Sequence, residues 1–260
     1  MQKKITMKEI YKSQGQCLFC GKMFSKAGII RHLSAHLSEI AVKEQRGKSF
    51  LLKIGTSKRH ESTPYFLSLW VDGETTLKTI DQFLRDIWLE CCRHLSAFSY
   101  PRSKRRSGSG LFDIMEVFEM LAKGNAETDS DDIPMSRKAK TVFKKGLVLD
   151  YEYDFGSTTA LNITVVDEYF VKAEKKVVLL SRNEPIPISC VTCKKAPATQ
   201  ICTACMYNED AEFCDKCAKK HAKACDEFDE YASMPVVNSP RMGVCGYTGG
   251  IIDTNRDSVK

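Results

Sequence analysis

Apolar and polar positions follow two different periods in the middle of the chain. Two strand-sized segments, 48–56 and 65–73, read KSFLLKIGT and YFLSLWVDG, and short apolar runs of this kind predict strands. In residues 76–90 the apolar side chains instead recur every three or four positions, which predicts a helix with one core-facing stripe. That stripe consists of Leu77, Ile80, Leu84, Ile87 and Trp88.

A hairpin is predicted for residues 147–166, LVLDYEYDFGSTTALNITVV. Strict alternation gives the first strand one apolar and one acidic face, and Gly156-Ser157 turn the chain into a second alternating strand. Three carboxylates in register would suit a hard cation such as Mg²⁺, but the solvated face of a half-buried strand is the favoured interpretation. The apolar positions are Leu149, Tyr151, Tyr153 and Phe155, then Leu161, Ile163 and Val165; the acidic ones are Asp150, Glu152 and Asp154.

Between these elements the composition changes sharply. Residues 101–110 have the composition of a mobile basic loop, 111–123 predict a helix, and 124–134 are typical of an acidic, flexible connector. Mixed strands and helices predict an α+β fold, with a compact central domain at 47–188. We expect small zinc-stabilised modules at 1–46 and 189–228, and a Gly/Pro-containing tail at 229–260.

Composition is ordinary for a soluble globular protein, with 43% hydrophobic and 28% charged residues in 260. No apolar run is long enough to cross a bilayer, and the N-terminal segment lacks the apolar core of a signal peptide. Twelve cysteines without an export signal favour reduced, metal-bound thiols in the cytoplasm over disulfides. Neither a membrane partner nor a particular oligomeric state is indicated.

Positive charge is concentrated at the N-terminus. Residues 1–60 contain thirteen Lys or Arg and three Glu, a balance of +10, so the other 200 residues sum to 6 − 10 = −4. A basic segment of this kind has reason to meet a phosphate backbone, and DNA or RNA is therefore an expected partner.

The N-terminal module contains a metal-ligand pattern. Cys17-x2-Cys20-x11-His32-x3-His36 resembles a two-Cys, two-His (C2H2-type) zinc finger, in which a hairpin and one helical turn supply the ligands. A module this small needs the metal to fold. Ser25, Gly28 and Arg31 occupy the positions that usually reach bases, and only Arg31 suits guanine. Lys22, Lys26 and Arg31 are the expected phosphate contacts, while a protein-binding finger is the alternative.

A second cysteine cluster lies in residues 190–225. Three C-x-x-C pairs are followed by a helix-spaced His and Cys, and eight ligands are the complement of two tetrahedral zinc ions. With the finger, three Zn²⁺ are expected, all in closed structural sites. The eight ligands are Cys190, Cys193, Cys202, Cys205, Cys214, Cys217, His221 and Cys225.

The spacing alone leaves open which ligands share an ion. In a sequential arrangement the first four and the last four ligands each hold one ion. The ending Cys-x3-His-x3-Cys resembles the HIT and MYND zinc-finger group, which implies cross-bracing. The first and third pairs, Cys190/Cys193 and Cys214/Cys217, would then hold one ion, and Cys202/Cys205 with His221/Cys225 the other.

Three further segments carry a family resemblance: RHLSAF (93–98), FKKGLVLDYEYDFGSTT (143–159) and PVVNSPRMGVCGYTGG (235–250). They are similar to the plasmid pRiA ORF-three-like family, also labelled TnpR-like passenger proteins of insertion sequences. The resemblance covers roughly residues 47–182 and the tail, and implies a compact α+β domain in a plasmid or mobile-element setting without an assigned reaction. Members usually have Asp and Trp after the Gly of Tyr-x-Tyr-Asp-Phe-Gly, whereas this chain has Ser157 and Thr158.

These observations favour a zinc-binding, nucleic-acid-binding or regulatory factor that uses its basic finger. The alternative is a protein-interaction adaptor built on structural zinc modules, and a divalent-metal enzyme using Asp150, Glu152 and Asp154 ranks last because no general base or nucleophile lies beside that row. Enzymatic activity is therefore not the expectation. The three remaining cysteines, Cys91, Cys92 and Cys245, could include a nucleophile, but Cys91 and Cys92 are interpreted as packing residues at the end of an apolar helix. His94 is close to them in sequence, which is weak evidence for a Cys–His dyad.

Overall fold

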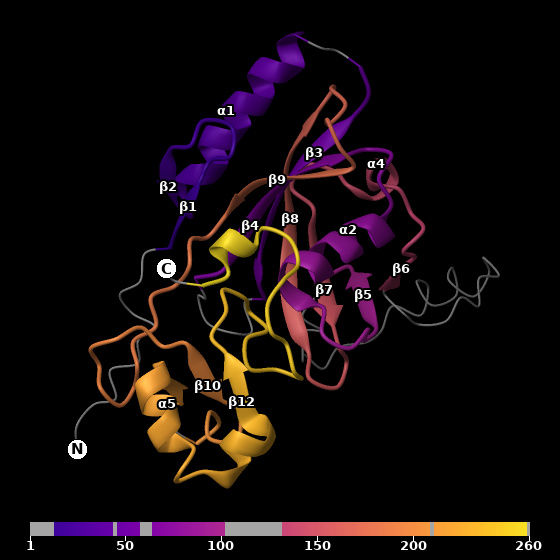
Figure 1. Cartoon of the computed structure of the whole chain (residues 1–260). Helices are drawn as coiled ribbons and strands as arrows, with labels where there is room; N and C mark the ends of the chain where they lie inside the picture. The colour runs from indigo at the N-terminus through magenta and orange to yellow at the C-terminus, as the bar shows by residue number, and fades with distance from the viewer. Residues whose placement is uncertain (1–12, 44–45, 58–63, 102–131, 209–210, 259–260) are drawn as a thin grey trace, which may run out of the picture.

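The computed structural model describes residues 13–43, 46–57, 64–101, 132–208 and 211–258 (Figure 1). The helix expected at 111–123 lies outside the described residues, as do almost all of the basic loop and most of the acidic connector. Within the described part of the chain, no helix is long and apolar enough to span a membrane.

A seven-stranded antiparallel sheet forms the centre of a mixed α+β fold. Its strand order is β6-β5-β7-β8-β3-β4-β9, and both predicted apolar runs are strands of it, which confirms the expected fold class. The strands are β3 (Ser49–Thr56), β4 (Phe66–Asp72), β5 (Ser96–Ser99), β6 (Asp132–Ile133), β7 (Val148–Tyr153), β8 (Thr159–Tyr169) and β9 (Val177–Arg182).

Strands β3 and β4 are apolar on both faces because both faces of the sheet are covered. Phe50 and Leu52 of β3 join the core below helix α2 (Leu77–Leu84), whereas Leu51 joins the core below helix α1 (Gly28–Lys43). Every residue of β4 is buried. A strand covered on both sides has no regular polar face, which explains why apolar residues follow one another along β4 and most of β3. The two helices lie on either side of the sheet (Figure 1).

The predicted helix at 76–90 is confirmed, but its last turn is wider than an α-helix. Thr76 caps α2 by accepting a hydrogen bond from the Thr79 N–H, and the chain continues as a π-helix, η2 (Arg85–Leu89). The Glu90 N–H bonds to the carbonyl of Arg85, five residues back. All five predicted stripe residues are buried.

The β7–β8 hairpin is also confirmed, except where its first strand ends. Tyr151 and Tyr153 are buried as predicted, but Phe155 is 55% exposed and Asp154 is 5% exposed. Asp154 has φ of +64°, and this left-handed conformation stops the alternation one residue after Tyr153. The expectation for Phe155 and Asp154 was therefore wrong.

The finger packs against the sheet instead of standing apart. A hairpin of β1 (Gln14–Gln16) and β2 (Met23–Ser25) precedes α1, whose buried residues Ile29, Leu33 and Leu37 recur at four-residue spacing. They share one apolar cluster with Leu51 and Trp70 of the sheet. The sheet therefore contributes apolar burial to this module in addition to any metal, which differs from a self-contained finger.

A small C-terminal module is built around residues 190–235. It has a three-stranded sheet in the order β11-β10-β12, the helix α5 (Asp215–His221) and the π-turn η3 (Phe228–Ala232). The strands are β10 (Gln200–Cys202), β11 (Glu212–Phe213) and β12 (Ser233–Pro235). The chain then returns to the central sheet and ends in the short helix η4 (Thr254–Arg256) (Figure 1).

Candidate metal centres

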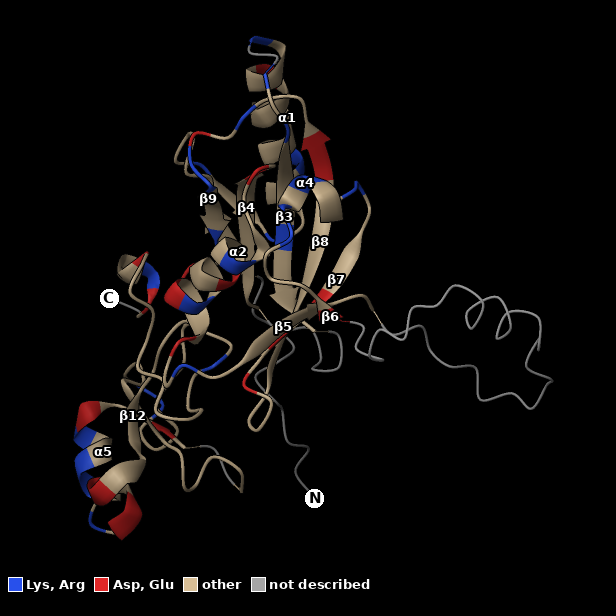
Figure 2. Ribbon diagram, turned by 90° about the vertical axis from the view of Figure 1, so that its right-hand side faces the viewer, with Lys and Arg blue, Asp and Glu red and all other residues tan. Residues whose placement is uncertain are grey.

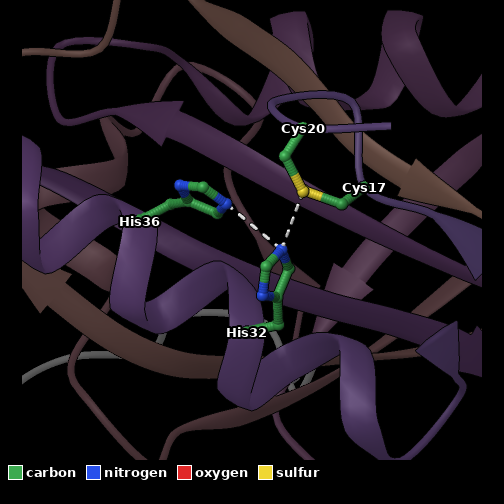
Figure 3. A group of neighbouring side chains, drawn as sticks. All are labelled: Cys17, Cys20, His32 and His36. Carbon is green, nitrogen blue, oxygen red and sulfur yellow. Dashed lines mark hydrogen bonds between the residues drawn. The ribbon is translucent and has the colours of Figure 1, made fainter. Parts of the chain in front are cut away.

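The four predicted finger ligands lie together between the β1–β2 turn and helix α1. Cys20 Sγ is 3.2 Å from His32 Nε2, and His36 Nε2 is 3.1 Å from the same atom (Figure 3). All four ligand atoms, including Cys17 Sγ, lie within 4.8 Å of one another. The edges of a tetrahedral zinc site with these ligands measure roughly 3.3–3.8 Å, so the group fits one zinc ion.

Local structure explains why these side chains converge. Gly21, with φ of +73°, closes the turn in which its N–H bonds to the Cys17 carbonyl, so both thiols lie on the same tight turn. On α1 the two histidines are one helical turn apart. Phe24 of β2 stacks on the His32 ring, with 4.0 Å between ring centroids.

The three predicted phosphate contacts of the finger have different environments. Lys22 and Arg31 are exposed. Lys26 is half-buried and donates a hydrogen bond to the Tyr65 carbonyl at 3.3 Å, and burial lowers the pKa of its amine. Ser25, one of the positions considered for base contacts, accepts a hydrogen bond from the Gly28 N–H and caps the helix. Of the three positions considered for base contacts, only Arg31 therefore has a long, exposed side chain.

The first group in the C-terminal module combines Cys190, Cys193, Cys214 and Cys217. Cys193 Sγ and Cys214 Sγ are 3.9 Å apart, close to the edge of a zinc–thiolate tetrahedron. Cys214 precedes the first residue of α5, so the last two ligands lie at the start of this helix. Burial disfavours the Cys190 thiolate, but backbone N–H groups, that of Cys193 first, lower the pKa of this thiol to about 6.

The second group combines Cys202, Cys205, His221 and Cys225. Cys225 Sγ is 4.0 Å from both other sulfurs, and Cys205 Sγ is 3.7 Å from His221 Nε2. The His221 ring is stacked on Phe213 at 4.3 Å, which fixes its orientation. The grouping is cross-braced, because the first and third ligand pairs come together and the second and fourth do.

Crowding of the thiols in this module opposes ionisation in the absence of a cation. Burial, followed by the Cys190 and Cys214 thiols, raises the pKa of Cys217 to about 12. Burial and the neighbouring Cys202 and Cys225 thiols raise the pKa of Cys205 to about 12. A divalent cation reverses this effect by stabilising the thiolates. Each group supplies four protein ligands, as structural zinc sites do.

The acidic row expected on β7 does not form one site. Asp150 accepts a hydrogen bond from the Asn162 amide at 2.5 Å, and Glu152 is half-buried on the same strand. Asp154 instead pairs with Arg241 at 2.7 Å and accepts bonds from two backbone N–H groups that follow it. The hydrogen bond from Arg241 holds the pKa of Asp154 at about 2. The geometry therefore does not support a metal site made of these three carboxylates.

A fourth group was not predicted from the sequence. Cys91, Cys92 and His94 lie beside Cys245, with all four ligand atoms within 4.8 Å of one another. The expectation that Cys91 and Cys92 only pack at a helix end was incomplete. The number of cysteines could have indicated this fourth group, because the three predicted sites use nine of the twelve cysteines and leave three without a role.

The fold and the sites together define a class: a mixed α+β protein with Cys/His groups suited to zinc at its N-terminal and C-terminal sides. No protein family model matches the chain, and no curated protein matches it. The solved structures that are similar include that of a protein of unknown function, MM3350, from Methanosarcina mazei Go1. The identity is 13% over 82% of this chain and 99% of that one, with a TM-score of 0.38.

Proposed function

We propose that this is a zinc-stabilised nucleic-acid-binding protein whose main phosphate-binding surface is one end of the central sheet. This surface, the basic end, lies where β3 and β9 begin and β4 and β8 end. Ser49 pairs with both Asp72 and Tyr169, and Val71 pairs with Val177. Loops far apart in the sequence are therefore neighbours here.

Backbone hydrogen bonds fasten these loops to one another. The Gly73 N–H donates to the Lys48 carbonyl at 2.7 Å, and the Lys140 N–H donates to the Gly73 carbonyl at 2.9 Å. The Asp72 N–H donates to the Lys176 carbonyl at 3.1 Å. A side chain on Gly73 would come within 2.6 Å of the Lys48 carbonyl, so this glycine permits the close approach.

Charge at the basic end is the observation that carries the proposal. Ten Lys or Arg and five Asp or Glu lie in these loops, a balance of 10 − 5 = +5, and all ten cations except half-buried Lys48 are exposed. In Figure 2 several blue segments lie near α4 (Ala139–Val142) and in the turn before β9. The cations are Arg46, Lys48, Arg137, Lys138, Lys140, Lys144, Lys145, Lys172, Lys175 and Lys176; the carboxylates are Asp72, Glu74, Asp167, Glu168 and Glu174.

The ion pairs at the basic end leave cations available. Glu74 pairs with Lys138 and Lys140, and hydrogen bonds from these two amines lower the pKa of Glu74 to about 2. Lys145 pairs with Asp167 at 3.0 Å. Lys144, Lys172 and Lys175 are exposed and have no ion pair within the described residues. Exposed lysines of this kind suit a phosphate backbone, which they contact without reading sequence.

In this proposal zinc supports the binding protein and performs no chemistry. The finger ligands would hold α1 against the sheet, and the cross-braced ligands would hold the C-terminal module together. Each of these three ligand sets is complete with four protein atoms, so none leaves a position for a substrate or an activated water.

Titration of labelled duplex DNA at several salt concentrations tests the proposal. Affinity should fall steeply with salt, with a log–log slope of about −0.9 for each phosphate neutralised. Changing Lys144, Lys172 and Lys175 to Gln should weaken binding and reduce the magnitude of the slope by about 3, roughly one for each lysine.

The matched control changes Lys194, Lys219 and Lys223 to Gln, because these exposed lysines remove the same charge from the C-terminal module. It should bind DNA almost as the wild type does. Equal effects of the two triple variants would refute the basic end as the specific surface, and salt-insensitive binding or none would refute nucleic-acid binding altogether. Changing Lys22 and Arg31 to Ala tests the finger separately.

A protein-interaction adaptor is the second candidate, and exposed aromatic rings on the C-terminal module favour it. Tyr207 is 80% exposed and Tyr231 is 67% exposed, and exposed tyrosines are common in protein interfaces. Copurification of one defined protein after nuclease treatment, lost when both tyrosines are changed to Ser, would support this candidate.

A further inference from the structure

Cys91, Cys92 and His94 meet Cys245 at the end of the sheet opposite the basic end. The first three follow η2, and Cys245 lies in the tail that returns from the C-terminal module. His94 Nε2 is 3.2 Å from Cys245 Sγ, and Cys92 Sγ is 3.9 Å from it. The two segments are separated by about 150 residues, so the fold alone brings them together.

These distances match a metal tetrahedron better than a disulfide. An S–S bond measures about 2.05 Å, whereas the edges of a tetrahedral site with thiolate and imidazole ligands are roughly 3.3–3.8 Å. The spacing also resembles that of the cross-braced groups, where the sulfur atoms lie 3.9–4.0 Å apart. In total, three thiols and one imidazole lie close together and make a complete set of four ligands.

Asp154 and Arg241 contact the proposed ligands from behind and orient them, as polar groups around the ligands of a metal site commonly do. The outer nitrogen of His94, Nδ1, is 3.6 Å from Asp154 Oδ1, while Nε2 points toward Cys245. A carboxylate behind a histidine fixes the tautomer that leaves the other nitrogen free for metal. Arg241, which is fully buried, bonds to Asp154 at 2.7 Å and to Cys91 Sγ at 3.3 Å.

We propose that Cys91, Cys92, His94 and Cys245 bind a fourth zinc ion. Binding releases three thiol protons and leaves one net negative charge on the centre, 2 − 3 = −1, beside the Arg241 guanidinium. The set is closed, so the ion is structural. All twelve cysteines of the chain and four histidines then form four complete groups of four.

The role of this ion is to clamp the tail onto the α+β domain. Hydrogen bonds near the site also join the tail to the α+β domain. Ser239 Oγ donates to the Trp88 carbonyl at 2.7 Å, and the Ile251 N–H donates to the Asp86 carbonyl at 2.7 Å. Cys245 has φ of +50°, a conformation uncommon for residues other than glycine. The bend directs its thiol toward His94, and the zinc bond supports the bend.

Native mass spectrometry of the full chain, purified under reducing, zinc-replete conditions, tests the proposal by counting ions. The wild type should carry four zinc ions, and the C92S/C245S double variant three. Leu95→Ala, which changes an exposed neighbour that is not a ligand, should carry four. Three ions in the wild type, or four in the double variant, would overturn the fourth site.

Thiol alkylation of the wild type gives a second test that does not depend on a variant folding. Cys92 and Cys245 are exposed, so the reagent reaches free thiols at these positions, whereas zinc-bound thiolates should be protected until a chelator is added. Zinc-loaded and chelator-treated protein are compared at the same alkaline pH, at which free thiols react as thiolates. Immediate modification in the zinc-loaded protein contradicts the proposal.

The Asp154→Asn variant tests whether the Asp154 carboxylate orients His94. It should weaken the fourth ion about 10–100-fold in competition with a chelator and leave the cross-braced ions unchanged. Equal weakening at all sites would indicate general destabilisation and remove Asp154 from this role.

Discussion

Gly250 shows how closely the tail approaches the helical layer. A Cβ atom at this position would lie 2.5 Å from the Ile87 carbonyl oxygen and 2.8 Å from that of Asp86. Both neighbours are backbone atoms, which cannot rotate away as a flexible side chain does. Gly246 is different, because its surroundings are open and only its φ of +71° restricts it.

We therefore expect Gly250→Ala to lower the free energy of unfolding by about 1–3 kcal/mol and to increase proteolysis of the tail. Gly246→Ala is the matched control and should lower it by only about 1 kcal/mol, the strain of a left-handed alanine. Denaturant unfolding of both variants measures the difference. A smaller loss for Gly250→Ala than for Gly246→Ala would show that the tail does not pack as described.

At the scale of elements, a polar network joins α2 to β5 and β7 inside an apolar core. Asp81 accepts hydrogen bonds from Tyr151 at 2.7 Å and from Ser96 at 2.6 Å, and it pairs with Arg85 at 2.9 Å. Arg85 in turn reaches Glu90 at 2.9 Å. Asp81 is one α-helical turn before Arg85, and the widened turn of η2 brings Glu90 within reach of the same arginine.

Replacing Asp81 by Ala should lower the free energy of unfolding by about 3 kcal/mol or more, because Arg85 then loses its least exposed partner. Gln82→Ala, on the exposed side of the same helix, should change it by less than about 0.5 kcal/mol. Thermal or urea unfolding checks both values. Similar small effects of the two changes would mean that the network is not coupled to the stability of the fold.

At the scale of the whole molecule, the central sheet and the C-terminal module differ in how much apolar core stabilises them. The central sheet buries a large cluster of aliphatic and aromatic residues, whereas seven of the eleven buried residues in the cluster of the C-terminal module are proposed ligands or alanines. A module with so little apolar core depends on its metal.

Removal of zinc by a strong chelator should therefore unfold residues 190–235 and leave the central sheet folded. Hydrogen exchange followed by mass spectrometry should show loss of amide protection in β10–β12 and α5, with protection retained in β3, β4 and β8. Helix α1 should lose only part of its protection, because Ile29, Leu33 and Leu37 remain packed on the sheet. Uniform loss across the chain would contradict this division.

Lowering the pH should weaken zinc binding, as adding a chelator does. In the proposed sites zinc would hold Cys205 and Cys217 as thiolates, although burial and neighbouring thiols raise the pKa of each to about 12 without metal. Protons therefore compete with zinc, and affinity should fall as pH is lowered, by up to about tenfold per pH unit for each thiol proton displaced. Chelator competition at several pH values measures this slope, and a flat profile would exclude thiolate ligation.

Local spacing was sufficient to predict much of this protein. The apolar runs that became β3 and β4, the stripe on α2 and the Cys and His pairs were all apparent from the sequence. Each of these patterns lies within one strand, one helix or one tight turn, where a few bonds fix the direction of the side chains. The pattern misled at Phe155, because the left-handed backbone of Asp154 depends on its contact with Arg241 in the tail.

Only the tertiary structure decided which distant groups meet. It brings Cys91, Cys92 and His94 together with Cys245, selects the cross-braced grouping, and collects lysines from four loops at one end of the central sheet. Strand order and loop contacts determine these neighbours, and they arise from packing of the whole core. For that reason no short window of the sequence contains them.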